Sequence, residues 1–142
     1  MATTRKAETH WEGSLADGSG RVQLVSSGVG GFDVTWASRA EDPNGRTSPE
    51  ELIAAAHSSC FSMALSHALA QAGTPPTSLD VSAEVDFQAG TGITAIRLGV
   101  TGTVPGLDQA GFEKAANDAK ANCPVSQALK AVPIALTDAT LR

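Results

Sequence analysis

The chain has 142 residues, of which 42% are hydrophobic and 18% are charged, and its formal net charge is -5. This length suits one domain with a hydrophobic core, so we expect residues 1–142 to form a single domain. The acidic balance gives no electrostatic reason for nucleic acid or an anionic membrane to bind, and both partners are disfavoured.

The start of the chain and its two cysteines bear on its location. Residues 1–10 are polar and lack the apolar segment of a signal peptide, and no uninterrupted apolar stretch approaches the length of a membrane span. We therefore expect a cytoplasmic protein. Because a structural disulfide is unusual in that compartment, Cys60 and Cys123 are either inert thiols or chemically active ones.

The first third of the chain contains strand-like runs separated by turns that hold glycine. Phe32, Val34 and Trp36 alternate with more polar or smaller residues, as in a half-buried strand. The three runs are 6–15, 21–26 and 32–38.

The strongest element is a long helix over residues 51–72. Ser48 is a typical helix cap, Pro49 suits the first turn, and Glu51 follows three residues after the cap. The helix carries no charge between Leu52 and Gln71 and is apolar on nearly every side, which predicts a buried helix.

The rest of the chain alternates strands and helices. Residues 79–88 and 93–104 read as strands joined by a hairpin, and 108–122 as an amphipathic helix. A short helical piece at 125–131 and a last strand at 134–141 follow. We therefore expect an α+β fold in which antiparallel strands cover the buried central helix.

Cys60 lies in the middle of that helix, where a lone cysteine is most often just a small hydrophobic residue. Two features favour a chemical role. First, the helical period places it on a stripe that mixes apolar and titratable residues. Second, Cys123 directly precedes Pro124 at a predicted helix break, where a thiol is mobile and accessible enough to resolve an oxidised partner. The stripe comprises Ile53, His57, Cys60, Ala64 and His67.

A cysteine that attacks peroxide must be a thiolate, and burial alone raises the pKa of a thiol. Cys60 also lies about 15 Å along the helix from Glu50, too far to benefit from the dipole of its own helix. The fold must therefore bring a cation to Cys60. Arg39 is the first candidate because its guanidinium stays charged and can orient a peroxide oxygen, His57 is the second, and Arg46 the third.

Two other interpretations stay open from the residues alone. His57, Cys60 and His67, with Cys123 as a fourth ligand, could form a metal site. The short ligand spacings usual for zinc are absent, however, and the two histidines span about three helical turns, so we expect no metal. The chain could also be a non-enzymatic binding protein whose cysteines are inert.

Two motifs resemble those of the osmotically inducible hydroperoxide reductases, the OsmC family. They are SPEELIAAAHSSCFSMAL at 48–65, preceded by Arg39, and NCPVS at 122–126. The resemblance extends over essentially the whole chain. The sister branch, the organic hydroperoxide resistance (Ohr) proteins, places its arginine much nearer the N-terminus, so the position of Arg39 favours the OsmC branch.

The resemblance implies a role for each matched residue. Cys60 would be the peroxidatic cysteine, oxidised to a sulfenic acid, and Cys123 the resolving cysteine that forms a redox-active disulfide with it. Arg39 would stabilise the Cys60 thiolate, and Glu50 would hold Arg39. Substrate-pocket walls for the alkyl part of the peroxide would come from four residues near Cys60: Ile53, His57, Phe61 and Met63.

The resemblance also implies partners. Family members are intertwined homodimers that prefer organic hydroperoxides, bind no cofactor and take electrons from an external dithiol, with dihydrolipoyl groups favoured. The implied context is an antioxidant defence under oxidative or osmotic stress. Because Glu50 and Cys60 are too far apart on one helix to share a site, a second copy of the helix should run antiparallel, with its Glu50 end near Cys60 of the first.

Overall fold

The computed structural model describes all 142 residues as six strands and four helices, which confirms the α+β class. The chain forms two compact units, Met1–Leu52 and Ile53–Arg142. The expectation that 1–142 behaves as one domain stays a prediction.

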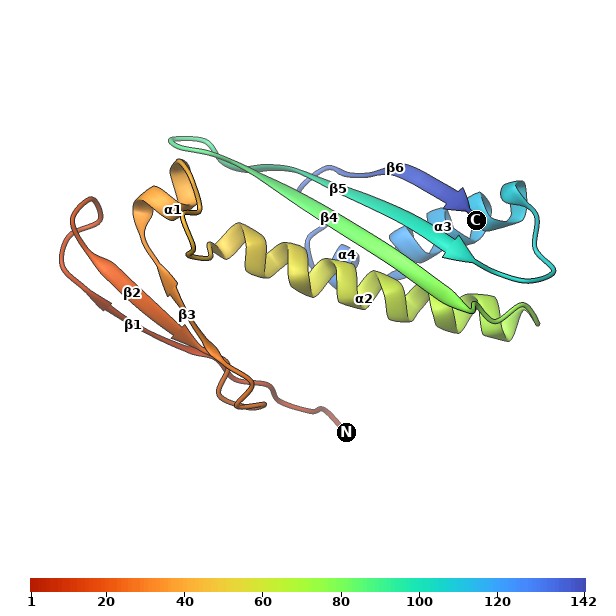
Figure 1. The fold of residues 1–142 in the computed structure, drawn as a ribbon, viewed down its shortest axis with the longest axis horizontal. Helices are drawn as coiled ribbons and strands as arrows, with labels where there is room; N and C mark the ends of the chain where they lie inside the picture. Colours follow the sequence, from red (N-terminus) through yellow and green to blue (C-terminus); the bar gives the residue numbers. More distant parts are fainter. The chain divides into compact units, whose positions relative to one another are not determined.

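The first unit is built on a three-stranded antiparallel sheet of β1 (Glu8–Glu12), β2 (Ser19–Gln23) and β3 (Gly31–Val34), in that order (Figure 1). Most side chains of the sheet are exposed, and Val22 is its one buried residue. The three predicted strands are thus present but shorter than expected.

The predicted third strand is wrong beyond Val34, because Trp36–Ala40 forms the short helix α1. The cause is a capping box in which the Ser38 N–H donates to Thr35 Oγ1 and the Thr35 N–H donates to Ser38 Oγ, both at 3.0 Å. These reciprocal bonds satisfy backbone donors that a strand would have used in its ladder. Arg39 therefore lies on a helix rather than directly after a strand.

Helix α2 (Pro49–Gln71) begins and ends close to where its signals predict. Ser48 Oγ accepts the Glu51 N–H at 3.1 Å, as expected of a cap. The Glu51 carboxylate does not complete a capping box but accepts the Thr47 hydroxyl at 2.6 Å, which ties the preceding loop to the helix. Gly73, with φ of 87°, lies beyond the last turn.

The second unit contains the sheet β4 (Ser78–Gln88), β5 (Gly92–Thr103) and β6 (Ile134–Leu141), in that order. Strands β4 and β5 form the expected antiparallel hairpin, but β6 runs parallel to β5. The helices α3 (Gln109–Asn122) and α4 (Pro124–Ala128) form the crossover that a parallel pair requires. The expectation of antiparallel strands therefore fails only for β6.

The core of the second unit lies where α2 and α3 pack against one face of this sheet (Figure 1). Gly102 on β5 allows α3 to approach, because a Cβ atom there would lie 2.8 Å from the Phe112 ring. The largest members of the core are Phe61, Leu65, Leu69, Leu98, Val100 and Phe112.

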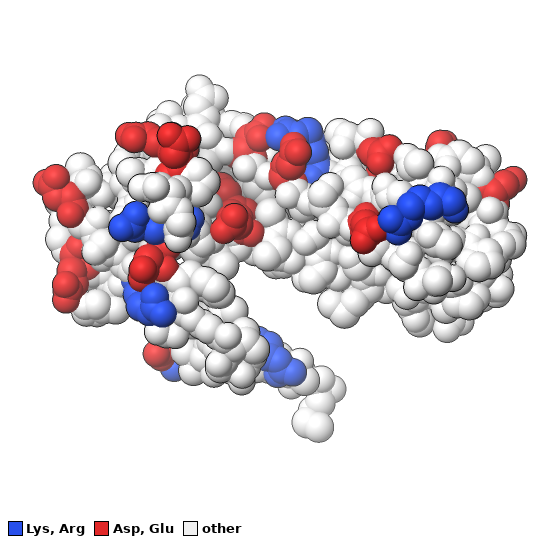
Figure 2. Space-filling view, viewed as in Figure 1, with Lys and Arg blue, Asp and Glu red and all other residues white.

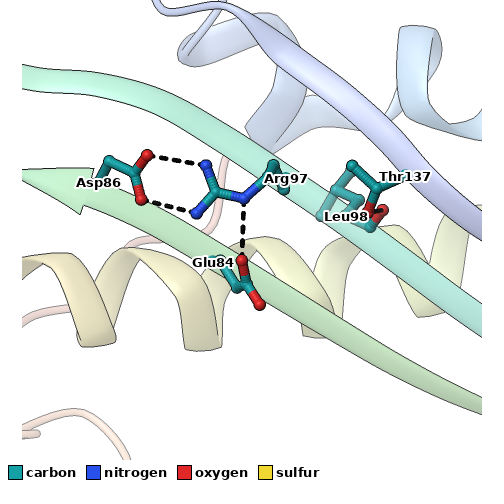
Figure 3. Close-up of polar contacts among 5 residues, drawn as sticks. All are labelled: Glu84, Asp86, Arg97, Leu98 and Thr137. Atoms are coloured by element: carbon teal, nitrogen blue, oxygen red, sulfur yellow. Dashed lines mark hydrogen bonds and ion pairs between the residues drawn. The ribbon is translucent and has the colours of Figure 1, made fainter.

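The opposite face of the sheet carries charge. Arg97 on β5 donates to Asp86 through both terminal nitrogens at 2.7 Å and to Glu84 through Nε at 2.9 Å (Figure 3). Two alternating acidic residues of β4 thus pair with a basic residue on the neighbouring strand. In the space-filling view, basic side chains lie beside acidic ones, and no large patch of one sign gathers on the visible face (Figure 2).

Helix α2 is buried along one face only. Phe61 and Leu65 are fully buried, whereas Met63 is 67% exposed and Ala55, Ala56 and Ala68 are also exposed. The prediction of a helix buried on all sides is therefore wrong for the single chain, which buries one face of α2.

Contrary to the sequence-based expectation, α2 is long and apolar enough to span a membrane by length and composition. Core helices of soluble proteins pass the same test, so this property is weak evidence for a membrane span.

Candidate functional site

The structure brings Cys60 and Cys123 together from opposite halves of the chain. Both are free thiols, and they hydrogen bond to each other. Cys60 lies in the middle of α2 and is partly buried, while Cys123 lies between α3 and α4 and is fully buried. The expectation that Cys123 is the more accessible thiol is therefore wrong.

The backbone around Cys123 explains its position. The Cys123 N–H donates to Ala119 O at 2.8 Å and ends α3, and its extended φ/ψ of -55° and 128° then turn the chain into α4. Pro124 starts α4 and has no N–H to lose, so the predicted break at this proline is confirmed. The break points the Cys123 side chain into the core beside α2.

The two thiols differ in acidity. Burial, followed by the hydrogen bond from Cys60 to Cys123, raises the pKa of Cys60, and the Val125 amide opposes this only in part. Burial also pushes the pKa of Cys123 upward. The N–H of Ser126, the thiol of Cys60 and further hydrogen bonds outweigh that effect, so the pKa of Cys123 is lowered. The hydrogen bond between the two thiols thus raises the pKa of Cys60 and lowers that of Cys123.

His57 lies one turn before Cys60 on α2 and is fully buried. Its Nε2 lies 2.7 Å from Ser126 Oγ, and its Nδ1 has no hydrogen-bond partner. Burial lowers the pKa of His57 below 6.5, so the ring is neutral near pH 7. His57 therefore does not supply the positive charge for which it was the second candidate.

Arg39 and Glu50, both in the first unit, form a bidentate ion pair. Arg39 Nε lies 3.0 and 3.3 Å from the two carboxylate oxygens of Glu50, and its terminal nitrogen lies 2.8 Å from Oε1. Helix α1 presents the arginine and the first turn of α2 presents the glutamate. The Glu50 side chain is 7% exposed and the Arg39 side chain 32%, so the pair is fixed yet reachable from solvent.

The remaining candidate residues have different environments. Ile53 is partly buried, and Phe61 belongs to the hydrophobic core. Met63 and the exposed His67 line an open cavity of about 530 Å³ between α2 and the start of β4. Arg46, the third candidate cation, is exposed.

The metal-site interpretation requires His57, Cys60, His67 and Cys123 to converge. The structure contains no group of three or more His, Cys, Asp or Glu side chains that could hold a metal ion. His57 is buried against Ser126 while His67 lies at the surface, so the two histidines face different surroundings.

Sequence reasoning missed Ser126. Its hydroxyl bonds to His57, and both its hydroxyl and its N–H favour a thiolate at Cys123. The one available signal was its position three residues after Cys123, in the first turn of α4.

Known proteins resemble this chain over most of its length. Residues 42–137 match the family model OsmC, described as OsmC-like protein. The chain is 45% identical over 134 residues to the peroxiredoxin OsmC of Escherichia coli (strain K12), covering 92% of this chain and 93% of that protein, and equally to the peroxiredoxin OsmC of Shigella flexneri.

Solved structures share the fold. One is the organic hydroperoxide resistance protein OsmC of Legionella pneumophila, with a TM-score of 0.74, 23% identity and coverage of 99% of this chain and 98% of that one. Another is the organic hydroperoxide resistance protein OhrB of Bacillus subtilis, with a TM-score of 0.68, 23% identity and coverage of 96% and 98%. The chain belongs to the OsmC family.

Proposed function

We propose that this protein is a thiol-dependent peroxidase that reduces organic hydroperoxides to alcohols. The observation that carries the proposal is the hydrogen-bonded pair of free thiols, Cys60 and Cys123, in a chain 45% identical to a protein named peroxiredoxin OsmC. Two thiols that hydrogen bond to each other can form a disulfide without a large movement of the backbone.

In the proposed reaction the Cys60 thiolate attacks the distal oxygen of the hydroperoxide. The O–O bond breaks, the alkoxide takes a proton and leaves as the alcohol, and Cys60 becomes a sulfenic acid. Cys123 then attacks the Cys60 sulfur, a disulfide forms, and the hydroxyl leaves as water. An external dithiol, with a dihydrolipoyl group favoured, reduces the disulfide and becomes a disulfide itself. No bound cofactor takes part.

The proposal assigns Arg39 to the Cys60 thiolate. Because burial raises the pKa of Cys60, the thiolate needs a nearby cation, and His57 is neutral. Arg39 remains charged, and its bidentate contact with Glu50 fixes the orientation of its guanidinium group. Glu50 thus acts as a positioning residue that holds Arg39 and can release it when Cys60 is oxidised.

We further propose that the working protein is an intertwined homodimer. The apolar face of α2 that the single chain leaves exposed, which includes Met63 and Ala56, would be covered by a second copy of the chain. With the two α2 helices antiparallel, the Glu50 end of one would lie near Cys60 of the other, because about 15 Å separates these positions along one helix.

The alkyl group of the peroxide would contact apolar residues around Cys60. Ile53 and Met63 are the walls that remain accessible in the single chain, while Phe61 and His57 are fully buried and would shape the pocket from beneath. A cytoplasmic location and a role in oxidative or osmotic stress complete the proposal.

The test is steady-state consumption of cumene hydroperoxide and of hydrogen peroxide with dihydrolipoamide as reductant. Wild type should turn over the organic peroxide faster than hydrogen peroxide, Cys60→Ser should be inactive, and Cys123→Ser should lose sustained turnover. Ser82→Ala, an exposed serine on β4, is the control and should match wild type. A wild type that is inert with several thiol donors would overturn the proposal in favour of a binding protein.

A further inference from the structure

The chemical steps proposed above use neither His57, which would only shape the pocket from beneath, nor Ser126, although the two form a buried hydrogen bond beside both cysteines. We propose that His57, acting through the Ser126 hydroxyl, is a positioning residue that holds the Cys123 sulfur ready to attack oxidised Cys60. This inference rests on the proposed function, because it assigns a control of the resolving step.

The position of the single proton on His57 follows from its surroundings. The pKa of the buried ring is lowered, so it is neutral and carries one N–H. If that hydrogen were on Nδ1, a buried donor would have no partner, because Nδ1 makes no hydrogen bond. Buried N–H groups without a partner are rarer than buried acceptors without one. The hydrogen therefore lies on Nε2, which donates to Ser126 Oγ at 2.7 Å.

This assignment fixes the direction of the next hydrogen bond. Because Ser126 Oγ accepts from His57, its own hydrogen is available to donate toward Cys123, which lies one helical turn earlier in the chain. A hydrogen bond from the Ser126 side chain adds to the larger effect of the Ser126 N–H in lowering the pKa of Cys123. The donors thus run from His57 through Ser126 to Cys123, and the Cys60 thiol also donates to the Cys123 sulfur. Successive donors that point one way strengthen one another.

The network affects the resolving step because the thiolate is the nucleophile. Once Cys60 is a sulfenic acid, Cys123 attacks its sulfur. The new S–S bond forms as the S–O bond breaks, and the hydroxide takes the proton released by Cys123 and leaves as water. Cys123 is fully buried, and burial alone would keep it protonated. Donors around its sulfur therefore decide how fast the disulfide closes.

The test compares the full-length variants Ser126→Ala and His57→Met with His57→Gln, whose amide keeps an N–H donor near the position of Nε2. Two quantities are measured. The first is the pKa of Cys123 in a Cys60→Ser background, from thiolate absorbance. The second is the ratio of disulfide closure to sulfenic acid formation after one equivalent of cumene hydroperoxide, from dimedone trapping and mass spectrometry. Ser82→Ala and His10→Gln, both exposed, are the controls.

We expect Ser126→Ala and His57→Met to raise the pKa of Cys123 by about one unit and to lower the closure ratio about tenfold, the usual effect of one hydrogen bond to a charged group. In His57→Gln, the pKa of Cys123 and the closure ratio should both lie close to their wild-type values. A purely structural role of the His57 ring would not explain that recovery. An unchanged pKa and closure ratio in Ser126→Ala would overturn the inference, and this variant decides if His57→Met does not fold.

If wild type forms no sulfenic acid, the proposed peroxidase function fails. The pKa comparison still shows in that case whether the network acts on Cys123.

Discussion

His57 Nε2 and Ser126 Oγ lie 2.7 Å apart in the core, although the two residues are 69 positions apart in the chain. The bond joins α2, which carries Cys60, to α4, which follows Cys123. Because His57 is buried and neutral at the point where these two helices meet, we expect substitutions of His57 to change both the stability of the fold and the reactivity of the thiols.

Stability should fall in mild acid because of His57. Its pKa is lowered from 6.5 by burial, so below that pH the unfolded chain binds a proton that the folded chain resists. The contribution of His57 to the free energy of unfolding is complete above about pH 6.5. It is lost as the pH falls toward the pKa of His57 in the folded state, by at most about 1.4 kcal/mol per pH unit. Urea unfolding of wild type and His57→Gln between pH 7.5 and 5 measures it. The control is His10→Gln, which removes an exposed histidine, and an equally steep slope in His57→Gln and in wild type would contradict the prediction.

Loss of the ion pair between Arg39 and Glu50 should affect the rate of peroxide reduction more than the stability of the fold. Arg39→Met removes the cation proposed for the Cys60 thiolate and should slow the first reaction with cumene hydroperoxide by about a hundredfold. Glu50→Gln leaves the cation in place but loosens its orientation, so its loss of rate should be smaller. Stopped-flow measurement of the first turnover separates the two variants. Wild-type rates in Arg39→Met would remove Arg39 from the mechanism.

The hydrophobic core should depend strongly on the buried face of α2. Phe61 is fully buried against α3 and β5, so Phe61→Ala should lower the free energy of unfolding by about 3–5 kcal/mol. The matched control is Val29→Ala in the turn before β3, where the side chain is 75% exposed and the change should stay within about 0.5 kcal/mol. Urea denaturation measures the free energy of unfolding of both variants. A similar decrease in the two would contradict the prediction that Phe61 is a main stabilising residue of the core.

The exposed face of α2 provides a test of the dimer. Met63 is 67% exposed in the single chain, and a second copy would bury it. Met63→Glu should therefore produce monomers at concentrations where wild type is dimeric, because an unpaired buried carboxylate is costly. Ala110→Glu, at the exposed start of α3, is the control and should remain dimeric. Sedimentation equilibrium measures the state of association of each variant. A wild type that is monomeric at every protein concentration tested would refute the dimer.

The sequence predicted those parts of the fold that depend on local signals. The Ser48 cap and the break at Pro124 placed the start of α2 and the end of α3 correctly, because caps and breakers act within a few residues. The α1 segment was mistaken for a strand because Trp36 continued the alternation begun by Phe32, while the capping box between Thr35 and Ser38 decided otherwise. The direction of β6 depends on a crossover through two helices, which strand periodicity does not encode.

The site was predictable only where motifs were specific. The resemblance around Cys60 and Cys123 paired two cysteines that the fold does bring together. It did not indicate that Cys123 is the more buried thiol or that hydrogen bonds from Ser126 lower its pKa, because both properties come from packing around α4. His57 was considered as a cation because its neighbours were unknown, and burial makes it neutral.

The central claim is that the sulfur of Cys60 attacks the peroxide, and the most direct measurement is mass spectrometry of the Cys123→Ser variant after one equivalent of cumene hydroperoxide in the presence of dimedone. The prediction is one dimedone adduct on the peptide that contains Cys60, and in wild type a disulfide between Cys60 and Cys123 instead. Oxygen captured on another residue, or peroxide consumption by Cys60→Ser at the wild-type rate, would contradict the claim.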